Sequence, residues 1–450
     1  MNARPNVVLI LTDHFRSDAL GRNTPRLSAL ARSGVNFTNA YCAAPLCQPA
    51  RVALVTGTYP SQNGICGNQS DPVGPELRDD TFMHHLRAAG YRTALVGKHH
   101  YIDRYGIGMD VREDDEEVAR YGFDSVLQVL DDGENGHNED GYTAFLREQG
   151  LFEEFRAALG NRGYRHPFEE QFYADCFIAA RGVEFVEKYA EEEPFYLNLS
   201  FIGPHPPLWH PGELRNDPEK MAAPVGAPDD ERIRERRAHY ADKCALIDGY
   251  VGRLVDALEK RGRLENTVII FTSDHGDMLG DFGIEDKRHF YEQSAGVPLF
   301  MCGAGVPHTE RNNGPRLCRS LVSHLDLYAT VLALAGLEQP PDRRRDGRDL
   351  VALARGDAGA GRAAVFSELG TCAMIRTPGW KLVFDPEQGG VVKLFNMHAD
   401  PQELQNLAGV AGYEGVSGEL VARLLAERIR RTQFTHIKEQ QRLQGVRAGY

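Results

Sequence analysis

The sequence predicts an α/β fold built on a large, mostly parallel sheet flanked by helices, with a smaller α+β unit at its C-terminal end. Short apolar runs rich in β-branched residues recur along the chain and alternate with segments that carry helix-end signals. The 450 residues, 42% of them hydrophobic, suffice for a large core. A connection rich in Pro, Arg, Asp and Gly, residues 339–362, precedes the last part of the chain. We therefore expect a catalytic unit over residues 1–345 and a C-terminal subdomain over residues 346–450.

The elements of the large unit are predicted from periodicity and end signals. Thr24-Pro25 and Gly34 bracket one helix, and Thr81 and Gly90 bracket another. The longest helix should span residues 230–261, where an apolar side chain returns every three to four residues. The predicted buried strands are residues 6–11, 93–96, 195–201, 267–271 and 298–301.

The C-terminal subdomain should hold a small antiparallel sheet and a terminal helix. Its predicted strands are residues 364–367, 381–384 and 391–395, and its helix is residues 417–431. Residues 101–175 show no clear pattern. The acidic clusters at 113–117 and 131–140 are interpreted as solvated loops.

Charge and composition exclude several classes of protein. The formal net charge is −13 and is spread along the chain, which argues against binding to nucleic acid or to an anionic membrane. The apolar run at residues 7–11 is too short for a signal peptide or a membrane span, so we expect a cytoplasmic protein. Eight scattered cysteines without a CxxC pair fit a reducing compartment, and most should be buried as small hydrophobic side chains.

Residues able to carry chemistry follow four of the predicted strands. In open α/β sheets, ligands bind beyond the carboxyl ends of the strands, so these side chains should converge on one pocket. A single histidine after a strand is usually structural, but four such positions are harder to dismiss. The residues are Asp13 and His14, then Lys98, His99 and His100, then His205, and finally Asp274 and His275.

The pairs Asp13-His14 and Asp274-His275 suit a divalent cation with mainly oxygen ligands. Asp277 and Asp281 follow in a Gly-rich loop and are either alternative ligands or residues that shape the loop. The cations Lys98, Arg51 and Lys287 are expected to face an anionic group and to stabilise charge in a transition state.

The segment Leu46-Cys47-Gln48-Pro49-Ala50-Arg51 is the most specific signal. Pro49 fits the first turn of a helix, which places Cys47 at the helix N-terminus, where free N–H groups favour an anion. The segment resembles the C-x-P-x-R signature of the formylglycine-dependent sulfatase family, within the alkaline phosphatase superfamily. In that family a maturation enzyme oxidises this cysteine to formylglycine, and the LCxPxR form fits such an enzyme.

The resemblance covers most of the chain outside residues 101–175. Residues 6–21, 56–65 and 96–101 resemble the family's first metal loop, the segment after its signature and its G-K-x-H motif. Residues 201–207, 271–283, 346–350 and 394–407 resemble its later landmarks. The resemblance implies an alkaline-phosphatase-like fold. It also implies a metal held by Asp13, His14, Cys47, Asp274 and His275, and a catalytic set of Cys47, Arg51, Lys98, His100, His205 and Lys287.

Three departures from the family pattern bear on the site. His14 stands where a second Asp is common, and His275 stands where Asn is common. A more nitrogen-rich site keeps Mn²⁺ and Mg²⁺ open beside Ca²⁺, the family's usual ion. Arg288-His289 replaces small residues, and these two side chains are expected to line the substrate pocket.

The family chemistry implies that residue 47, as an aldehyde hydrate, attacks the sulfur of a sulfate ester. The resemblance further implies that Lys287 and His205 bind the sulfate, and that His100 takes the proton in the step that regenerates the aldehyde. The partners implied are a small sulfated substrate and a formylglycine-generating enzyme. The pocket rim is expected from residues 101–175, residues 206–228 and the C-terminal subdomain. Alternatives are a phosphonate monoester or phosphodiester hydrolase, an inactive binding relative that keeps the thiol, and a metal-dependent phosphatase using that thiol.

Overall fold

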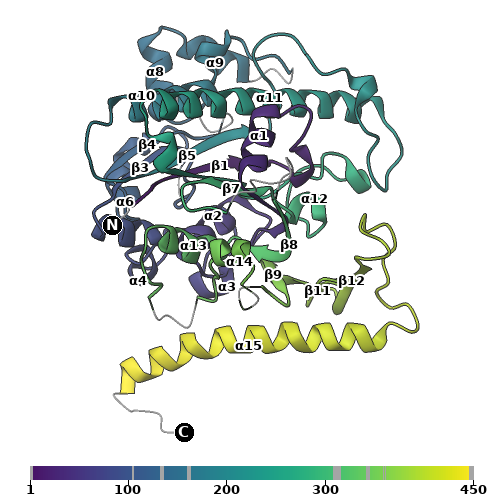
Figure 1. Ribbon diagram of the computed structural model, residues 1–450. Coiled ribbons are helices and arrows are strands. Elements are labelled where there is room, and N and C mark those ends of the chain that lie inside the picture. Colours follow the sequence, from purple (N-terminus) through teal and green to yellow (C-terminus); the bar gives the residue numbers. More distant parts are fainter. Residues whose placement is uncertain are drawn as a thin grey trace.

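The chain folds around two β-sheets. The structure is a computed structural model that describes residues 4–103, 106–131, 136–159, 164–307, 316–340, 345–357, 359 and 361–444. Side chains are described up to residue 431. Within these residues the large sheet has eight strands in the order β4-β3-β5-β1-β6-β7-β2-β8 (Figure 1). Its strands are β1 (Asn6–Asp13), β2 (Val35–Tyr41), β3 (Arg92–Gly97), β4 (Ser125–Gln128), β5 (Phe195–Pro204), β6 (Thr267–Ser273), β7 (Leu299–Gly303) and β8 (Arg316–Ser323).

The five predicted strands are confirmed, and the sheet is mostly parallel as expected. The exception is β7, which runs antiparallel to both β6 and β2. β2, β4 and β8 were not predicted. β4 has four residues and lies at one edge, and β8 lies at the other edge with alternating exposed and half-buried residues. Edge strands bury less apolar surface than central ones, so the apolar signal of β4 and β8 is weaker.

Helices cover both faces of the large sheet. Because side chains alternate along a strand, Val7, Leu9 and Leu11 of β1 join one core while Val8 and Ile10 join the other. The first core packs against α2 (Cys47–Thr56), α5 (Phe82–Ala88), α13 (Asp326–Leu334) and α14 (Leu350–Arg355). The second packs against α1 (Pro25–Ser33), α8 (Gly141–Glu148), α9 (Phe152–Leu159), α10 (Ala174–Lys188) and α11 (Glu231–Lys260), which lie together in Figure 1.

The three predicted helices of the large unit are confirmed as α1, α5 and α11, with ends close to those expected. Asp230 caps α11 by accepting the backbone N–H of Arg232 at 2.8 Å. The remaining short helices are α3 (Pro60–Asn63), α4 (Pro75–Arg78), α6 (Asp115–Ala119) and α12 (Glu292–Ala295). Short 3₁₀ turns lie at Ser17–Ala19, Val111–Asp114, Glu170–Phe172, Pro218–Lys220, Leu264–Asn266 and Asp281–Gly283.

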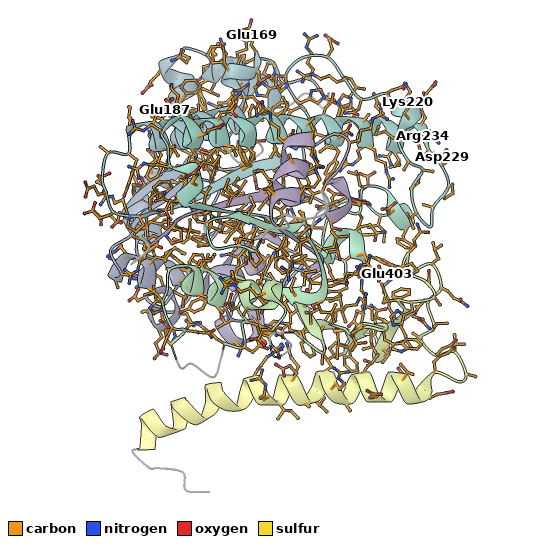
Figure 2. All side chains as sticks on the ribbon, viewed as in Figure 1. Glu169, Glu187, Lys220, Asp229, Arg234 and Glu403 are labelled. Atoms are coloured by element: carbon orange, nitrogen blue, oxygen red, sulfur yellow. The ribbon has the colours of Figure 1, made fainter. Side chains whose placement is uncertain are left out.

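The interpretation of the two acidic clusters as solvated loops is wrong in three respects. The first cluster is helical, in the 3₁₀ turn at Val111–Asp114 and in α6. In the second, Asp140 is fully buried and caps α8, and Asp131 enters the candidate active site, while residues 132–135 lie outside the described residues. Other acidic side chains do lie in solvent. Figure 2 places Glu169 and Glu187 at the periphery, near α10.

The C-terminal subdomain contains an antiparallel sheet in the order β12-β11-β10-β9, with strands β9 (Val365–Leu369), β10 (Cys372–Arg376), β11 (Trp380–Asp385) and β12 (Gly390–Asn396). Three of these strands were predicted, and β10 was missed. The terminal helix α15 (Glu414–Gln444) is longer than predicted. One face of this sheet adds Val365, Met374 and Val383 to the core of the large sheet, and the other packs on α15. The boundary at residues 345/346 stays a prediction.

Two further expectations concern the cysteines and membranes. All eight cysteines are free thiols, and five are buried, as predicted for most of them. Among the described helices, none combines the length and the apolar character needed to cross a bilayer.

Candidate active site

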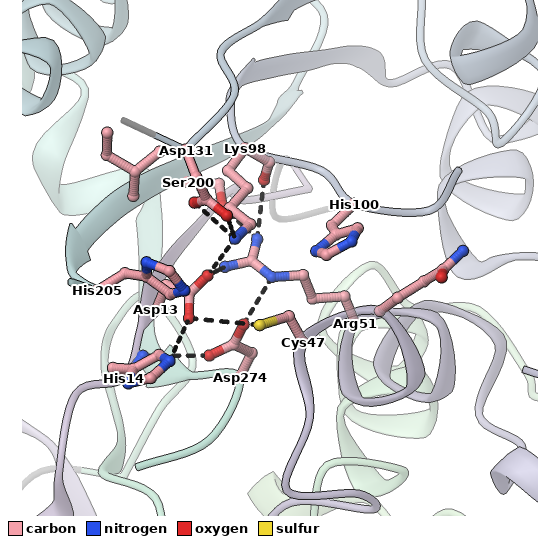
Figure 3. A network of polar contacts seen from close by, with 12 residues as sticks. Asp13, His14, Cys47, Arg51, Lys98, His100, Asp131, Ser200, His205 and Asp274 are labelled. Atoms are coloured by element: carbon pink, nitrogen blue, oxygen red, sulfur yellow. Dashed lines mark hydrogen bonds and ion pairs between the residues drawn. The ribbon is translucent and has the colours of Figure 1, made fainter. Parts of the chain in front are cut away.

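The predicted strand-end residues meet because their four strands are neighbours. β3, β5, β1 and β6 lie side by side and run parallel, so their carboxyl ends form one continuous edge. Figure 3 shows Asp13 from β1, Lys98 and His100 after β3, His205 after β5 and Asp274 after β6 around a single centre. This confirms the predicted convergence, with one exception described below for His99.

Cys47 occupies the middle of this centre. It is the first residue of α2, whose ten residues are all buried, and the extended backbone of Leu46 precedes it. The helix ends at Gly57, whose left-handed backbone (φ 67°) favours glycine. Cys47 Sγ lies 3.1 Å from His275 Nε2 and 3.8 Å from Asp13 Oδ1. The helix N-terminus therefore presents residue 47 to a cluster of carboxylates and imidazoles.

Arg51 lies one turn further along α2 and is fully buried. Its guanidinium donates to Asp274 Oδ2 at 2.8 Å, to the Lys98 carbonyl at 2.9 Å and to Ser200 Oγ at 3.0 Å. It also lies 3.4 Å from Asp13 Oδ2. Arg51 thus ties α2 to the ends of β1, β3, β5 and β6.

Lys98 connects two carboxylates at the centre. Its ammonium lies 2.5 Å from Asp13 Oδ2 and donates to both oxygens of Asp131 at 2.7 Å. Gly97, the residue before Lys98, has a φ of 107°. A Cβ atom at position 97 would lie 1.9 Å from the Ser200 carbonyl oxygen, so a residue with a side chain does not fit there. Asp131 was not among the predicted site residues. The strand-end rule applies to it as well, because it follows β4, but the four residues of that strand give only a weak apolar pattern.

Donor atoms for a cation come together beside Cys47. One oxygen each of Asp13 and Asp274, a ring nitrogen of His275 and Cys47 Sγ all lie within 4.8 Å of one another, and all four residues are buried. A second overlapping group contains Asp13, His14, Cys47 and His205. Two carboxylates with one or two imidazoles form a donor set that fits a divalent cation. The predicted metal residues therefore converge, and their chemistry suits the ion.

His14 and Lys287 form a chain of hydrogen bonds at the edge of this set. His14 Nδ1 lies 2.7 Å from Asp277 Oδ2, while Lys287 Nζ donates to His14 Nε2 at 2.8 Å and to His205 Nε2 at 2.9 Å. Asp277 therefore orients His14. Asp281, the other residue left open by sequence, accepts from Arg16, Arg237 and the Val225 backbone, so it shapes the loop.

His99 and His100 point to different places. His99 Nδ1 accepts the Tyr101 backbone N–H at 2.9 Å, so Nε2 carries the proton and donates to Gln128 Oε1 at 2.6 Å. His99 is therefore a structural residue beneath the site, contrary to its expected place in the pocket. His100 lines the pocket, and its Nε2 lies 2.8 Å from Asp103 Oδ2. Asp103 is a second residue that the sequence analysis missed.

The local charges favour an anion at position 47. Burial raises the pKa of the Cys47 thiol, but Lys287, Lys98 and His275 outweigh it and hold the pKa well below 9.0. Burial lowers the pKa of His275, but Asp274 and Cys47 raise it to about 9. Burial is the main cause that lowers the pKa of His205 to about 3, so this imidazole is neutral and accepts from Lys287.

An open pocket of about 670 Å³ leads to Cys47. Arg288 lines it as predicted, and the C-terminal subdomain contributes one wall. His289 and residues 206–228 are not among the described lining residues, contrary to expectation. The lining consists of Leu46, Cys47, Cys66, Gly67, Asn68, Gln69, His100, Asp103, Asp131, His205, Lys287, Arg288, Leu369, Gly370, Thr371 and Glu387.

Comparison with solved structures identifies the class of fold. The crystal structure of the phosphonate monoester hydrolase of Agrobacterium radiobacter superposes with a TM-score of 0.79, at 25% identity, over 95% of this chain and 96% of that one. A putative sulfatase from Bacteroides thetaiotaomicron superposes with a TM-score of 0.72 at 21% identity, over 99% and 95% of the two chains. The fold is the alkaline-phosphatase-like fold that the sequence predicted.

Comparison of sequences identifies the family. The Sulfatase family model matches residues 5–337, and the model described as N-sulphoglucosamine sulphohydrolase, C-terminal, matches residues 280–430. The choline-sulfatase of Rhizobium meliloti is 30% identical over 90% of this chain and 82% of that protein. The arylsulfatase of Clostridium perfringens is 27% identical over 91% and 92%. The chain therefore belongs to the sulfatase family. Its enzyme class is that of the sulfuric ester hydrolases.

Proposed function

We propose that this enzyme hydrolyses the sulfate ester of a small alcohol in a metal-dependent reaction whose nucleophile is made from Cys47 by conversion to formylglycine. The observation that carries the proposal is the position of Cys47. It begins a buried helix, lies 3.1 Å from His275 Nε2, and stands at the bottom of a pocket that also holds His100, His205 and Lys287. A maturation enzyme of the formylglycine-generating type is then a required partner.

The metal would be held by Asp13, Asp274 and His275, with His14 and residue 47 at the same centre. When bound, a divalent cation supplies a Lewis acid for a sulfate oxygen and lowers the cost of an anionic nucleophile. The carboxylates favour Ca²⁺ or Mg²⁺, and the imidazoles make Mn²⁺ a candidate. Arg51 holds the Asp274 carboxylate, and Lys98 holds that of Asp13.

The remaining residues act on substrate and protons. The Lys287 ammonium, held between His14 and His205, is placed to bind a sulfate oxygen and to stabilise the charge that develops on it. His205 accepts a hydrogen bond from Lys287 and so orients that ammonium toward the sulfate and the leaving alcohol oxygen, and His100 accepts a proton from residue 47. Formylglycine supplies a hydrated aldehyde whose second hydroxyl allows the nucleophile to be regenerated.

Hydrolysis of a phosphonate monoester or phosphodiester is the second candidate, because the similarity to the Agrobacterium radiobacter enzyme extends over 95% of this chain. Rates on an aryl sulfate, an aryl phosphonate monoester and a phosphodiester, measured in parallel on one preparation, distinguish the two. A preference for either phosphorus ester would replace the sulfate proposal.

Mass spectrometry of the peptide that contains Cys47 tests the nucleophile. Protein from the native host, or from cells that also express a formylglycine-generating enzyme, should carry an aldehyde or its hydrate at position 47. An unmodified thiol together with absence of bound metal would instead support a binding protein without catalytic activity.

A further inference from the structure

Asp103 is a buried carboxylate at the edge of the pocket that the proposed mechanism does not use. It is 9% exposed and comes three residues after His100. Asp103 Oδ2 lies 2.8 Å from His100 Nε2 and accepts the Gln69 backbone N–H at 2.8 Å. The Asp103 backbone N–H donates to the Ser70 carbonyl at 3.3 Å. These contacts fix the loop that carries His100 against the loop of residues 67–70.

The contact with Asp103 determines which ring nitrogen of His100 carries the proton. Burial raises the pKa of Asp103, but the His100 hydrogen bond and charge outweigh it and hold the pKa below its usual value. An ionised carboxylate can only accept, so Nε2 must donate. The other ring nitrogen, Nδ1, then carries no proton in the neutral ring and can act as an acceptor.

Nδ1 of His100 is the ring nitrogen that Asp103 does not contact. It is buried and, within the described part of the chain, makes no hydrogen bond of standard geometry. His100 and Cys47 line the same pocket. Because Asp103 occupies Nε2, Nδ1 is the ring nitrogen that remains to face the side chain of residue 47. Figure 3 shows the His100 ring on the side of the centre where α2 begins.

The backbone conformation of His100 indicates that surrounding contacts hold this residue in place. Its φ is 54°, in the left-handed region that a non-glycine residue rarely adopts. Residues held in such a conformation concentrate at active sites, because surrounding contacts must maintain them. Asp103 supplies two of those contacts, one to the ring and one to the neighbouring loop.

We propose that Asp103 is a positioning residue that holds the His100 ring so that Nδ1 accepts a proton from the side chain of residue 47. The O–H bond of the free hydroxyl on the sulfated residue 47 breaks and its proton moves to Nδ1, while the C=O bond of the aldehyde forms and the C–O bond to sulfate breaks. Sulfate leaves with the electron pair of that bond. The Nε2 proton stays in its hydrogen bond to Asp103, and Nδ1 then returns its proton to solvent through the open pocket. The carboxylate stabilises the imidazolium formed in between. The role in turnover rests on the proposed function, whereas the ring orientation does not.

Steady-state and first-turnover kinetics of Asp103→Asn test the role in turnover. We expect kcat to fall 10- to 100-fold, with release of the first equivalent of alcohol within about twofold of the wild-type rate. Asp103→Glu, which keeps the charge, should recover part of the loss. Asp110→Asn, in a residue whose carboxylate binds Arg112 at the surface, is the matched control and should behave as wild type.

A double-mutant cycle separates positioning from a general loss of structure. If Asp103 acts through His100, Asp103→Asn should cost less than twofold in a His100→Asn background. The same 10- to 100-fold cost in both backgrounds would overturn the proposal, as would an equal slowing of the first turnover.

The tautomer can be measured without turnover. Cys47→Ala protein is labelled with ¹⁵N-histidine and studied by NMR. The His100 signals are those that are absent from the Cys47→Ala/His100→Asn protein, and they should show a proton on Nε2 and none on Nδ1. The opposite tautomer would overturn the proposal. A wild-type enzyme that hydrolyses no sulfate ester, combined with the expected tautomer, would contradict the proposed function and leave the orientation of His100 established.

Discussion

Lys98 is held by Asp131 through two hydrogen bonds of 2.7 Å, although the two residues are separated by an entire helical segment of the chain. They meet because each follows one of two neighbouring parallel strands, β3 and β4. Burial raises the pKa of Asp131, but Lys98 lowers it to about 2, so the carboxylate is ionised throughout the working range. The pair fixes the ammonium beside Asp13 and the substrate pocket.

Asp131→Asn should therefore lower kcat/KM by about 10- to 100-fold, because Lys98 loses one of the two carboxylates that orient it. The thermal midpoint should change little, since Asp13 still faces the ammonium at 2.5 Å. Steady-state kinetics on a sulfate ester check the prediction. Asp79→Asn removes an exposed partner of Arg78 and serves as the control. Equal activities of the two variants would show that the pair is dispensable.

Arg51→Met should destabilise the fold by about 3–5 kcal/mol, because Asp274 and Asp13 would remain buried without their guanidinium. Arg51→Lys should recover only part of this loss, since an ammonium cannot reproduce the planar set of donors that reaches Asp274, Ser200 and the Lys98 carbonyl. Urea unfolding of the metal-free proteins gives the comparison. Arg26→Met, at an exposed ion pair with Asp256, should cost less than about 1 kcal/mol.

His99 should make the protein sensitive to acid. Burial is the main cause that lowers its pKa from 6.5 to about 3, so the unfolded chain binds the proton first as pH falls. Stability is then lost from about pH 6.5 downward until the folded state protonates near pH 3. Between pH 7 and pH 5 this residue should account for about 2 kcal/mol, which His99→Gln should remove. Urea unfolding at both pH values tests this, with His398→Gln, at an exposed histidine, as the control.

Removing the metal should inactivate the enzyme and destabilise it. The carboxylates of Asp13 and Asp274 then lose a counter-charge, and an ion present at 100 times its Kd is worth about 2.7 kcal/mol of stability. Dialysis against a chelator followed by Ca²⁺, Mn²⁺ or Mg²⁺ should show which ion restores both the thermal midpoint and activity. In Asp274→Asn protein the midpoint should no longer respond to any of them. Elemental analysis that finds no stoichiometric metal would contradict the assignment.

Cys47→Ser should release at most one equivalent of alcohol per chain. A serine hydroxyl can attack the ester, but it has no second hydroxyl on the same carbon to drive release of the sulfate. Rapid-quench measurement of alcohol per enzyme checks the number, and Cys47→Ala should release none. Repeated turnover by the serine variant would refute the proposed chemistry.

The central strands and three helices of the large unit were predictable because their signals are local. β1, β5 and β6 are buried along their whole length and read as continuous apolar runs, and the helix ends carry Thr24, Pro25 and Asp230 at the expected places. The strand-end rule also found Asp13, Lys98, His205 and Asp274. It failed for His99, because sequence does not determine to which side of a turn a side chain points.

The site residues that were not predicted either follow an edge strand of the large sheet or belong to the C-terminal subdomain. Asp131 follows β4, whose four residues are too few for a strong strand pattern. Thr371 and Glu387 enter the pocket wall because turns of the C-terminal sheet pack beside the large sheet. No local pattern encodes such long-range packing.

By itself, therefore, the sequence determined the fold class, the set of chemical groups and the place of Cys47 at a helix start, because strand burial and helix-start signals depend on adjacent residues. Only the tertiary structure decided how those groups are oriented. The bonds from Asp131 to Lys98, from Asp103 to His100 and from Asp277 to His14 select ammonium positions and ring tautomers. Each requires two side-chain atoms to lie 2.7 to 2.8 Å apart, a separation that only the folded chain fixes.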